Sequence, residues 1–263
     1  MITSFSALTR LERLFLGFLS PYSFPRAIQG NRHPPPTRAV LPSLLLFVYD
    51  GTNEYLEDLV ARFDAPVLAY ISITFFYRLT FDTPQLDLFI SRSPGPMFQP
   101  FNEVRLEFSY YQVEIKFPHA INLELGIRCD ALNKQLSSLV QLCGPSCLQH
   151  LISKVECLYI FPGILLSNNW QNYDEDGQWL EVLCLFVAVK NLYISAQFAV
   201  RIMCAMCVLE GERLSEMLPA LQNLLLEKLE SCQHVNVWEA TEDFVAAKRL
   251  SGHNIAVSQW YRE

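Results

Sequence analysis

A short pattern of apolar positions recurs along the chain. It consists of an apolar residue, two other residues, a second apolar residue, one other residue and a third apolar residue. The eight triplets are Leu11, Leu14 and Leu16; Leu41, Leu44 and Leu46; Leu68, Ile71 and Ile73; Phe101, Val104 and Leu106; Ala120, Leu123 and Leu125; Val155, Leu158 and Ile160; Val189, Leu192 and Ile194; and Leu221, Leu224 and Leu226. The last two positions of each are two residues apart, which is the spacing that places side chains on one face of a β-strand. The pattern predicts eight short strands, and Ile255 and Val257 predict a terminal one.

Segments with apolar residues at helical spacing lie between these strands. They cover residues 83–93, 130–144, 176–186, 198–218 and 238–252. The first begins with Thr83 as a candidate N-cap and Pro84 at the first helical position, and Gly144 and Gly252 are expected to end two others. Alternation of strands and helices favours parallel strand pairing. The interval from Leu106 to Leu125 has no room for a helix, and "YYQVEIKF" within it alternates with period two, so an additional strand is expected there.

The spacing of the triplets is close to regular, at about 30 residues, which is typical of stacked units that cannot bury their apolar face alone. The sequence therefore predicts an α/β fold of one domain spanning residues 1–263. We expect an irregular solenoid that resembles leucine-rich repeats, with a curved, mostly parallel sheet and helices on its convex side. Residues 1–50 would form truncated or irregular N-terminal repeats.

The residue between the last two apolar positions of each triplet should point away from the core, onto the concave face. Aromatic side chains and arginine on such a rigid surface are the residues that dominate binding energy in protein interfaces. The candidate partner-binding residues are Phe15, Leu45, Ser72, Arg105, Glu124, Tyr159, Tyr193 and Leu225. Two alternatives stay open at this point: a side loop covers these residues, or the strand register differs.

Composition and charge narrow the class of protein. Hydrophobic residues make up 51% of the chain, which is too apolar for a disordered protein. A net charge of −7 does not favour nucleic-acid binding, which depends on neutralising phosphates. The longest apolar runs are about half of the roughly 20 residues that cross a membrane, so no membrane association is expected. Eight cysteines lie mostly in apolar segments, which indicates free thiols in an intracellular compartment, cytoplasmic or nuclear.

Three segments have the spacing of metal or redox sites. Cys204 and Cys207 form a CxxC pair, but no second pair completes four zinc ligands, and core packing is the preferred interpretation. Cys143, Cys147 and His150 offer three ligands at a helix break. Residues 172–183 resemble a calcium loop except that Leu183 stands where the bidentate glutamate is needed. No phosphate-binding glycine loop or nucleophile motif occurs, so the sequence predicts neither an enzyme nor a cofactor.

Four longer phrases resemble a large fungal family of F-box-type proteins. They are "LTFDTPQLDLFISRSP", "QWLEVLCLFVAVKNLYIS", "GERLSEMLPALQNLLLEKL" and "FVAAKRLSGHNIAVSQW". The resemblance covers about Leu68 to Trp260 and corresponds to the leucine-rich C-terminal region of that family. It implies that the chain captures a protein substrate for a ubiquitin ligase, whose Skp-type adaptor and cullin are held by the F-box.

The N-terminal part departs from that family. The chain begins directly in a repeat, and Leu41-Pro42 fits the repeat better than the opening of an F-box, so the F-box is expected to be absent from this chain. Adaptor and cullin would be partners only if an F-box were encoded upstream. The alternative is a leucine-rich interaction or scaffold protein, or a decayed paralogue, with no link to a ligase.

Overall fold

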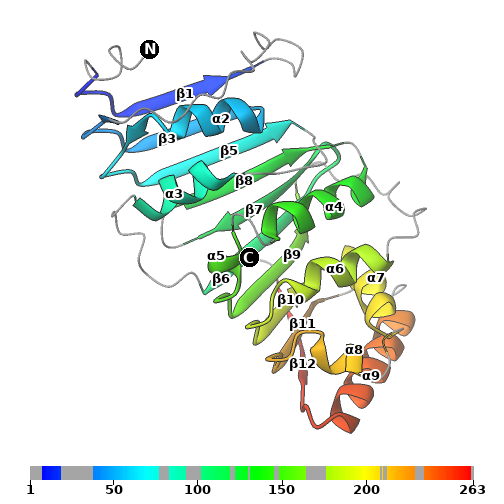
Figure 1. Cartoon of the computed structure of the whole chain (residues 1–263). Coiled ribbons are helices and arrows are strands. Elements are labelled where there is room, and N and C mark those ends of the chain that lie inside the picture. The colour runs from blue at the N-terminus through cyan, green and yellow to red at the C-terminus, as the bar shows by residue number, and fades with distance from the viewer. Residues whose placement is uncertain are drawn as a thin grey trace.

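The protein contains one large sheet of ten strands, as the computed structural model shows (Figure 1). The structure describes residues 8–18, 38–76, 83–92, 102–118, 122–129, 131–144, 148–163, 176–207, 209, 212–228 and 234–261. The strands follow the order β1-β3-β5-β8-β7-β6-β9-β10-β11-β12. Their bounds are β1 Arg13–Gly17, β3 Leu46–Gly51, β5 Tyr70–Phe76, β6 Glu103–Phe108, β7 Gln112–Phe117, β8 Asn122–Arg128, β9 Cys157–Pro162, β10 Asn191–Ile194, β11 Asn223–Glu227 and β12 Ala256–Trp260.

The sheet is parallel except at β7, which runs antiparallel to both β6 and β8. This strand is the additional one predicted between Leu106 and Leu125. The order of the strands across the sheet is also altered, because β6, β7 and β8 follow one another in the reverse of their order in the chain. As a result β5 lies beside β8, and β6 lies beside β9. A separate pair of short parallel strands, β2 (Ala39–Val40) and β4 (Phe63–Asp64), lies outside the large sheet. The prediction of a mostly parallel α/β sheet is confirmed.

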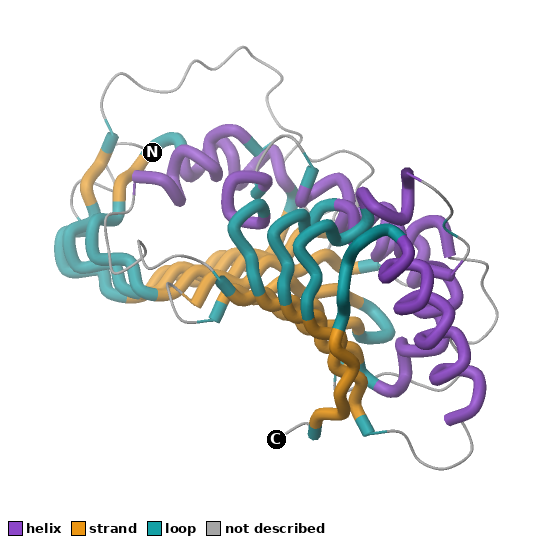
Figure 2. Tube along the Cα trace, turned by 90° about the horizontal axis from the view of Figure 1, so that it is seen from below, coloured by secondary structure: helices purple, strands orange, loops and turns teal. Residues whose placement is uncertain are grey.

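All of the helices labelled in Figure 1 lie on one side of the sheet, and Figure 2 shows them stacked along that side while the strand direction turns. They are α2 Asn53–Val60, α3 Pro84–Arg92, α4 Leu132–Cys143, α5 Gln149–Ile152, α6 Asp176–Cys184, α7 Ala196–Cys207, α8 Glu212–Glu216 and α9 His234–Leu250. The segment predicted as one helix over residues 198–218 is divided between α7 and α8. The predicted helices do not include residues 53–60, where α2 forms. Gly252 follows α9 with φ +88°, the left-handed conformation that favours glycine there.

The core fills the space between the sheet and these helices. Along each strand, buried and partly exposed residues alternate, and the buried ones face the helices because side chains on a strand point to opposite faces in turn. The buried apolar side chains form a single cluster from Ala39 to Ile255. Leu158, Leu192 and Leu224 occupy adjacent positions in β9, β10 and β11 and are all fully buried. From the third triplet onward, every triplet residue that the structure describes is buried. Phe101 and Ala120 lie outside the described residues.

One triplet was assigned to the wrong register. Leu46 is only partly buried, whereas Phe47 and Tyr49 are fully buried and pair with Ile71 and Ile73 of β5. The second unit is thus Leu44, Phe47 and Tyr49, three residues later than predicted. The cause is an uninterrupted apolar run from Leu44 to Tyr49, because a strand period of two cannot be read where every residue is apolar.

Carboxylates from neighbouring units cap two of the helices. Glu57 of α2 accepts hydrogen bonds from the backbone N–H groups of Gln85 (2.7 Å) and Leu86 (2.9 Å) at the start of α3. Glu227, at the end of β11, accepts one from the N–H of Ala196 at the start of α7 (3.0 Å). A carboxylate at a helix N-terminus satisfies unpaired donors and interacts favourably with the helix dipole. As predicted, α3 starts at Pro84 with Thr83 directly before it, and the Thr83 carbonyl accepts a hydrogen bond from the N–H of Asp87 at 3.1 Å. The Thr83 hydroxyl has no hydrogen-bond partner among the described residues.

We expect Glu57→Ala to destabilise the fold by about 1–2 kcal/mol, because two N–H groups of α3 would lose their acceptor. Urea unfolding followed by circular dichroism measures the change. Glu54→Ala, on the exposed side of the same helix, is the matched control and should cost clearly less. Equal losses for the two variants would show that Glu57 does not act as the cap.

Candidate interaction surface

The face of the sheet opposite the helices carries a continuous row of outward-pointing residues. Strand register places one residue of each strand in this row, in the order Phe15, Val48, Ser72, Glu124, Lys116, Arg105, Tyr159, Tyr193, Leu225 and Ser258. We call this surface the open face. Seven of the eight candidate residues lie in the row, because the strand triplets put them at equivalent positions.

Leu45 is the candidate that the structure does not place in the row. It precedes β3, is 46% exposed, and its carbonyl accepts hydrogen bonds from the N–H groups of Ala69 and Tyr70. Val48 takes the corresponding position, as a result of the register error in the second triplet. At the N-terminal edge of the sheet, Phe15 is 62% exposed.

An aromatic cluster forms where β9, β10 and β12 carry their outward side chains. The rings of Tyr159 and Tyr193 stack with centroids 4.1 Å apart and planes at 10°. The ring of Trp260 stands almost perpendicular to both, 6.3 Å from Tyr159 and 5.7 Å from Tyr193. The guanidinium carbon of Arg105 lies 5.6 Å from the centre of the Tyr159 ring, within the range of a cation–π contact. These contacts hold both tyrosines half-buried rather than freely exposed.

Trp260 also lies on this surface, although it is not among the residues predicted from the triplets. In β12, Val257 faces the core, so the period of two places Ala256, Ser258 and Trp260 on the open face. That alternation was visible in the sequence. What it could not show is that the indole reaches across β11 to both tyrosines.

Polar side chains beside the cluster are hydrogen-bonded across three strands. The Asn223 side-chain amide donates to the Asn191 oxygen at 2.7 Å, and the Asn191 amide lies 3.4 Å from the sulfur of Cys157. Arg105 donates from Nε to the Glu103 carboxylate at 2.7 Å. These bonds fix the strand side chains around the cluster in one arrangement.

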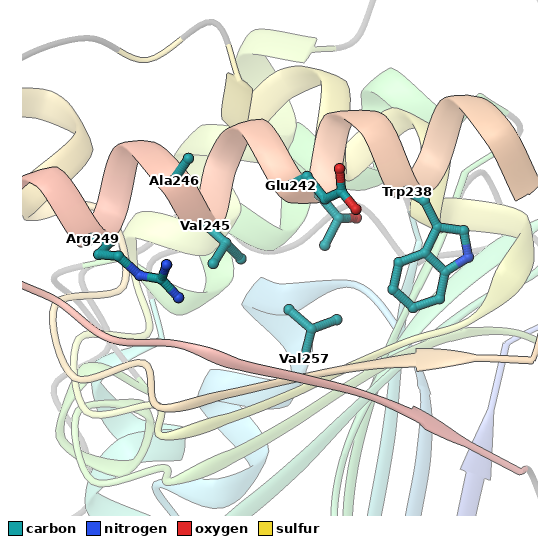
Figure 3. Close-up of a pocket in the computed structure, with 7 residues that line it drawn as sticks. Trp238, Glu242, Val245, Ala246, Arg249 and Val257 are labelled. Atoms are coloured by element: carbon teal, nitrogen blue, oxygen red, sulfur yellow. The ribbon is translucent and has the colours of Figure 1, made fainter.

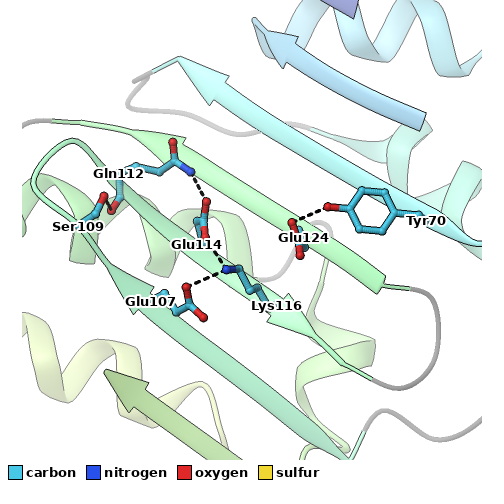
Figure 4. A network of polar contacts seen from close by, with 7 residues as sticks. All are labelled: Tyr70, Glu107, Ser109, Gln112, Glu114, Lys116 and Glu124. Atoms are coloured by element: carbon cyan, nitrogen blue, oxygen red, sulfur yellow. Dashed lines mark hydrogen bonds and ion pairs between the residues drawn. The ribbon is translucent and has the colours of Figure 1, made fainter. Parts of the chain in front are cut away.

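A charged network occupies the middle of the open face, on β6, β7 and β8 (Figure 4). The Lys116 ammonium lies 2.7 Å from a carboxylate oxygen of Glu107 and 2.8 Å from one of Glu114. Glu124 faces Lys116 in the adjacent strand and accepts a 2.7 Å hydrogen bond from the Tyr70 hydroxyl. Three glutamates therefore surround one lysine, and the group carries a formal charge of −2.

Two pKa shifts follow from these surroundings. Burial raises the pKa of the Tyr159 hydroxyl, and the nearby Tyr193 hydroxyl and Glu103 carboxylate add to the rise. Partial burial alone would lower the pKa of Lys116, but its hydrogen bonds to Glu107 and Glu114 outweigh that effect and raise it. At neutral pH the tyrosine is a neutral hydroxyl and the lysine is charged.

Tyr159 should make stability depend on pH in the alkaline range. Its pKa is higher in the folded protein than the value of about 10 expected when unfolded, so its contribution is complete below about pH 10. As the pH rises further, the unfolded state loses the proton first and this contribution falls. We expect the decline in unfolding free energy above pH 10 to be shallower in Tyr159→Phe, measured by urea unfolding at a series of pH values. Tyr111→Phe, which removes a hydroxyl from a 62% exposed residue, should follow the unmodified protein; identical curves for all three proteins would contradict the shift.

A hollow lies between α9 and β12, at the C-terminal edge of the sheet (Figure 3). It has a volume of about 330 Å³ and is lined by Trp238, Thr241, Glu242, Val245, Ala246, Arg249 and Val257. Val245 and Val257 face each other across it, with Trp238 at one end and Arg249 at the other. Val245, Ala246 and Val257 give the middle of the hollow an apolar lining, which can make apolar contacts.

Only some residues of the candidate metal and redox sites lie in the part of the chain that the structure describes. Met203 and Met206 are buried as expected, whereas Cys204 is exposed, so core packing of the whole CxxC segment is wrong. The Cys207 sulfur instead approaches the Ala240 carbonyl at 2.8 Å. Cys143 is buried and His150 exposed, while Cys147 lies outside the described residues. Residues 172–175 of the calcium-like segment also lie outside them, and residues 176–183 form part of α6. Among the residues that the structure describes, no three His, Cys, Asp or Glu side chains are grouped to hold a metal ion.

Lys248 of α9 is the fully buried cation on the helix side. Its ammonium donates to the Met217 carbonyl at 2.5 Å, just beyond the C-terminus of α8, where a positive charge complements the helix dipole. Burial lowers the pKa of this amine. This contact accounts for the burial of Lys248, which is part of the packing of α8 against α9.

Comparison with known proteins identifies no relative of this chain. No protein-family model, no curated protein and no solved structure matches the chain. A search of the described residues finds no helix that is long and apolar enough to cross a membrane.

Proposed function

We propose that this chain is a protein–protein interaction module that binds its partner through the open face of the sheet. The observation that supports this most directly is the aromatic cluster of Tyr159, Tyr193 and Trp260 with Arg105 beside it. Tyrosine, tryptophan and arginine are the residues enriched at the energetic centres of interfaces. Here they are grouped on the side of the sheet that carries no labelled helix.

The finer proposal is a leucine-rich-repeat-like solenoid that serves as the substrate-recognition region of an F-box-type ubiquitin-ligase receptor. It rests on the recurring apolar triplets and on the resemblance of residues 68–260 to that fungal family. The alternating strands and helices, with the helices together on one face, are consistent with such a repeat. The reversed strands β6 to β8 are a departure from a simple stack of units.

An immunoprecipitation from native cells tests the proposal. The full-length protein, tagged at its own locus, is compared with a Tyr193→Ala/Trp260→Ala variant of equal abundance. We expect the same partner protein to be recovered with the unmodified protein and to be lost with the variant. Recovery of one partner at equal yield with both proteins would place binding elsewhere on the molecule.

The same experiment separates the ligase role from the alternative of a scaffold. Skp-type adaptor and cullin should co-purify with the full-length protein if it is a ligase receptor, and they should do so equally with the variant because they do not use the open face. Recovery of a partner without adaptor or cullin would leave a leucine-rich interaction protein and remove the ubiquitin link. The tag must be placed so that any F-box encoded in the same gene is retained.

A further inference from the structure

We infer that the partner contacts the open face with an extended segment that carries an arginine or lysine about four to six residues from an aromatic or aliphatic residue. This inference rests on the proposed function and specifies the chemistry of the partner. It is carried by two features of the open face: the charged network at β6, β7 and β8, and the aromatic cluster at β9, β10 and β12.

The charged network provides the site for the cation. Lys116 is shared by Glu107 and Glu114, and Glu124 lies opposite Lys116 in register. Among the described residues, the hydrogen-bond donor to Glu124 is the neutral Tyr70 hydroxyl. The side chains of Glu107 and Glu114 are 22% and 32% exposed, so an incoming group can reach them without unfolding the network. A guanidinium or ammonium placed there compensates the excess negative charge, whereas a carboxylate is repelled.

The aromatic cluster provides the apolar contact. Tyr159 uses one ring face against Tyr193 and has the Arg105 guanidinium near its ring, while Trp260 meets both tyrosines nearly at right angles. The three rings are already locked by one another, so ordering them on binding costs little conformational entropy. Arg105 also keeps a second cation away from the Tyr159 ring. The basic residue of the partner therefore fits at the glutamates and not at the tyrosines.

Strand order sets the distance between these two contacts. Glu124 on β8 is separated from Tyr159 on β9 by three strand steps and from Tyr193 on β10 by four. At about 4.8 Å per step this is roughly 14–19 Å, which an extended chain rising about 3.3 Å per residue spans in about four to six residues. All the positions lie in one row across the strands, so a single segment crossing the sheet can reach both ends.

A selection from a random peptide display library on the purified full-length protein tests the inference. We expect enriched peptides to share Arg or Lys four to six positions from Trp, Tyr, Phe or Leu. The best peptide is then synthesised and titrated calorimetrically against the protein and its variants. Glu124→Gln should weaken binding roughly three- to ten-fold, as expected for loss of one partly exposed charge pair, and added salt should weaken it further.

Glu239→Gln is the matched control, because it removes an exposed carboxylate from α9 on the helix side. It should leave the peptide affinity unchanged, and replacing the peptide's basic residue by glutamate should abolish binding to the unmodified protein. Circular dichroism confirms that each variant is folded. Trp260→Ala should weaken every selected peptide regardless of its charge.

The outcomes separate this inference from the proposed function. Peptides that depend on Trp260 but contain no basic residue, or that bind Glu124→Gln with full affinity, would overturn the inference and leave the open face as the binding surface. A selection that yields no peptide sensitive to Trp260→Ala would contradict the proposed function itself.

Discussion

Trp179→Ala is expected to lower the free energy of unfolding by about 3–5 kcal/mol, the largest loss that we predict for a single substitution. Trp179 of α6 is fully buried, and its ring lies 5.3 Å from that of Phe108 in β6 and 5.5 Å from that of Phe198 in α7. The rings of Phe108 and Phe198 are themselves 5.2 Å apart. Alanine would leave a cavity where the sheet and two helices meet, and close-packed surroundings fill such a cavity only in part.

The change is measured by urea unfolding followed by far-ultraviolet circular dichroism. Trp238→Ala is the control, because Trp238 is only partly buried on α9, and it should cost much less. Trp179→Phe should recover most of the stability, since no partner of the indole nitrogen lies among the described residues and an aromatic ring is retained. A loss below about 1 kcal/mol for Trp179→Ala would mean that the three rings do not pack as described.

Leu192→Ala is expected to cost about 2–5 kcal/mol, whereas Tyr193→Ala should cost about 1–2 kcal/mol. Leu192 is fully buried between Leu158 and Leu224 on the core side of β10, and its neighbour Tyr193 points to the open face. The tyrosine change is not neutral, because its ring stacks on Tyr159 and part of its surface is buried. Stacking of this kind contributes about 0.5–1.5 kcal/mol beyond the buried area.

The comparison of the two variants tests the strand register directly. Both variants are unfolded by urea under the same conditions. The difference between their urea midpoints shows how much more stability is lost at the core-facing position of β10 than at the outward-facing one. Leu225→Ala, one strand away in the same row, should resemble Tyr193→Ala rather than Leu192→Ala. Equal large losses for Leu192→Ala and Tyr193→Ala would show that both faces of the strand are buried.

Much of the fold could be predicted because most of the apolar triplets have polar residues between their first two core positions. In "VECLYI" and "VKNLYI", for example, the spacing alone identifies Leu158 and Leu192 as core residues and Tyr159 and Tyr193 as outward ones. The prediction failed at residues 44–49, where every residue is apolar and both faces of the strand look alike. Periodicity reports which residues share a face, and it requires contrast between the two faces.

The order of the central strands could not be predicted in the same way. The spacing between Leu106 and Leu125 correctly indicated one more strand, but not that β8 would pair with β5 and β6 with β9. Pairing between strands distant in sequence leaves no local pattern. The charged network of Glu107, Glu114 and Lys116 was missed for this reason, since it exists only when β6 and β7 lie side by side.

Two arms of the sheet, β1 to β5 and β9 to β12, keep the strand order of the chain, and the block of β6, β7 and β8 joins them. In an arm, an ancestral duplication or deletion of one strand and its helix leaves the neighbouring strands still able to pair. The block of β6, β7 and β8 cannot lose a strand in this way. Deleting the six residues of β7 would bring β6 and β8 together as parallel strands, with a connection shorter than the dozen or so residues that a parallel crossover needs. Relatives of this protein should therefore differ in length through whole units gained or lost in the arms, and they should inherit the three central strands as one piece.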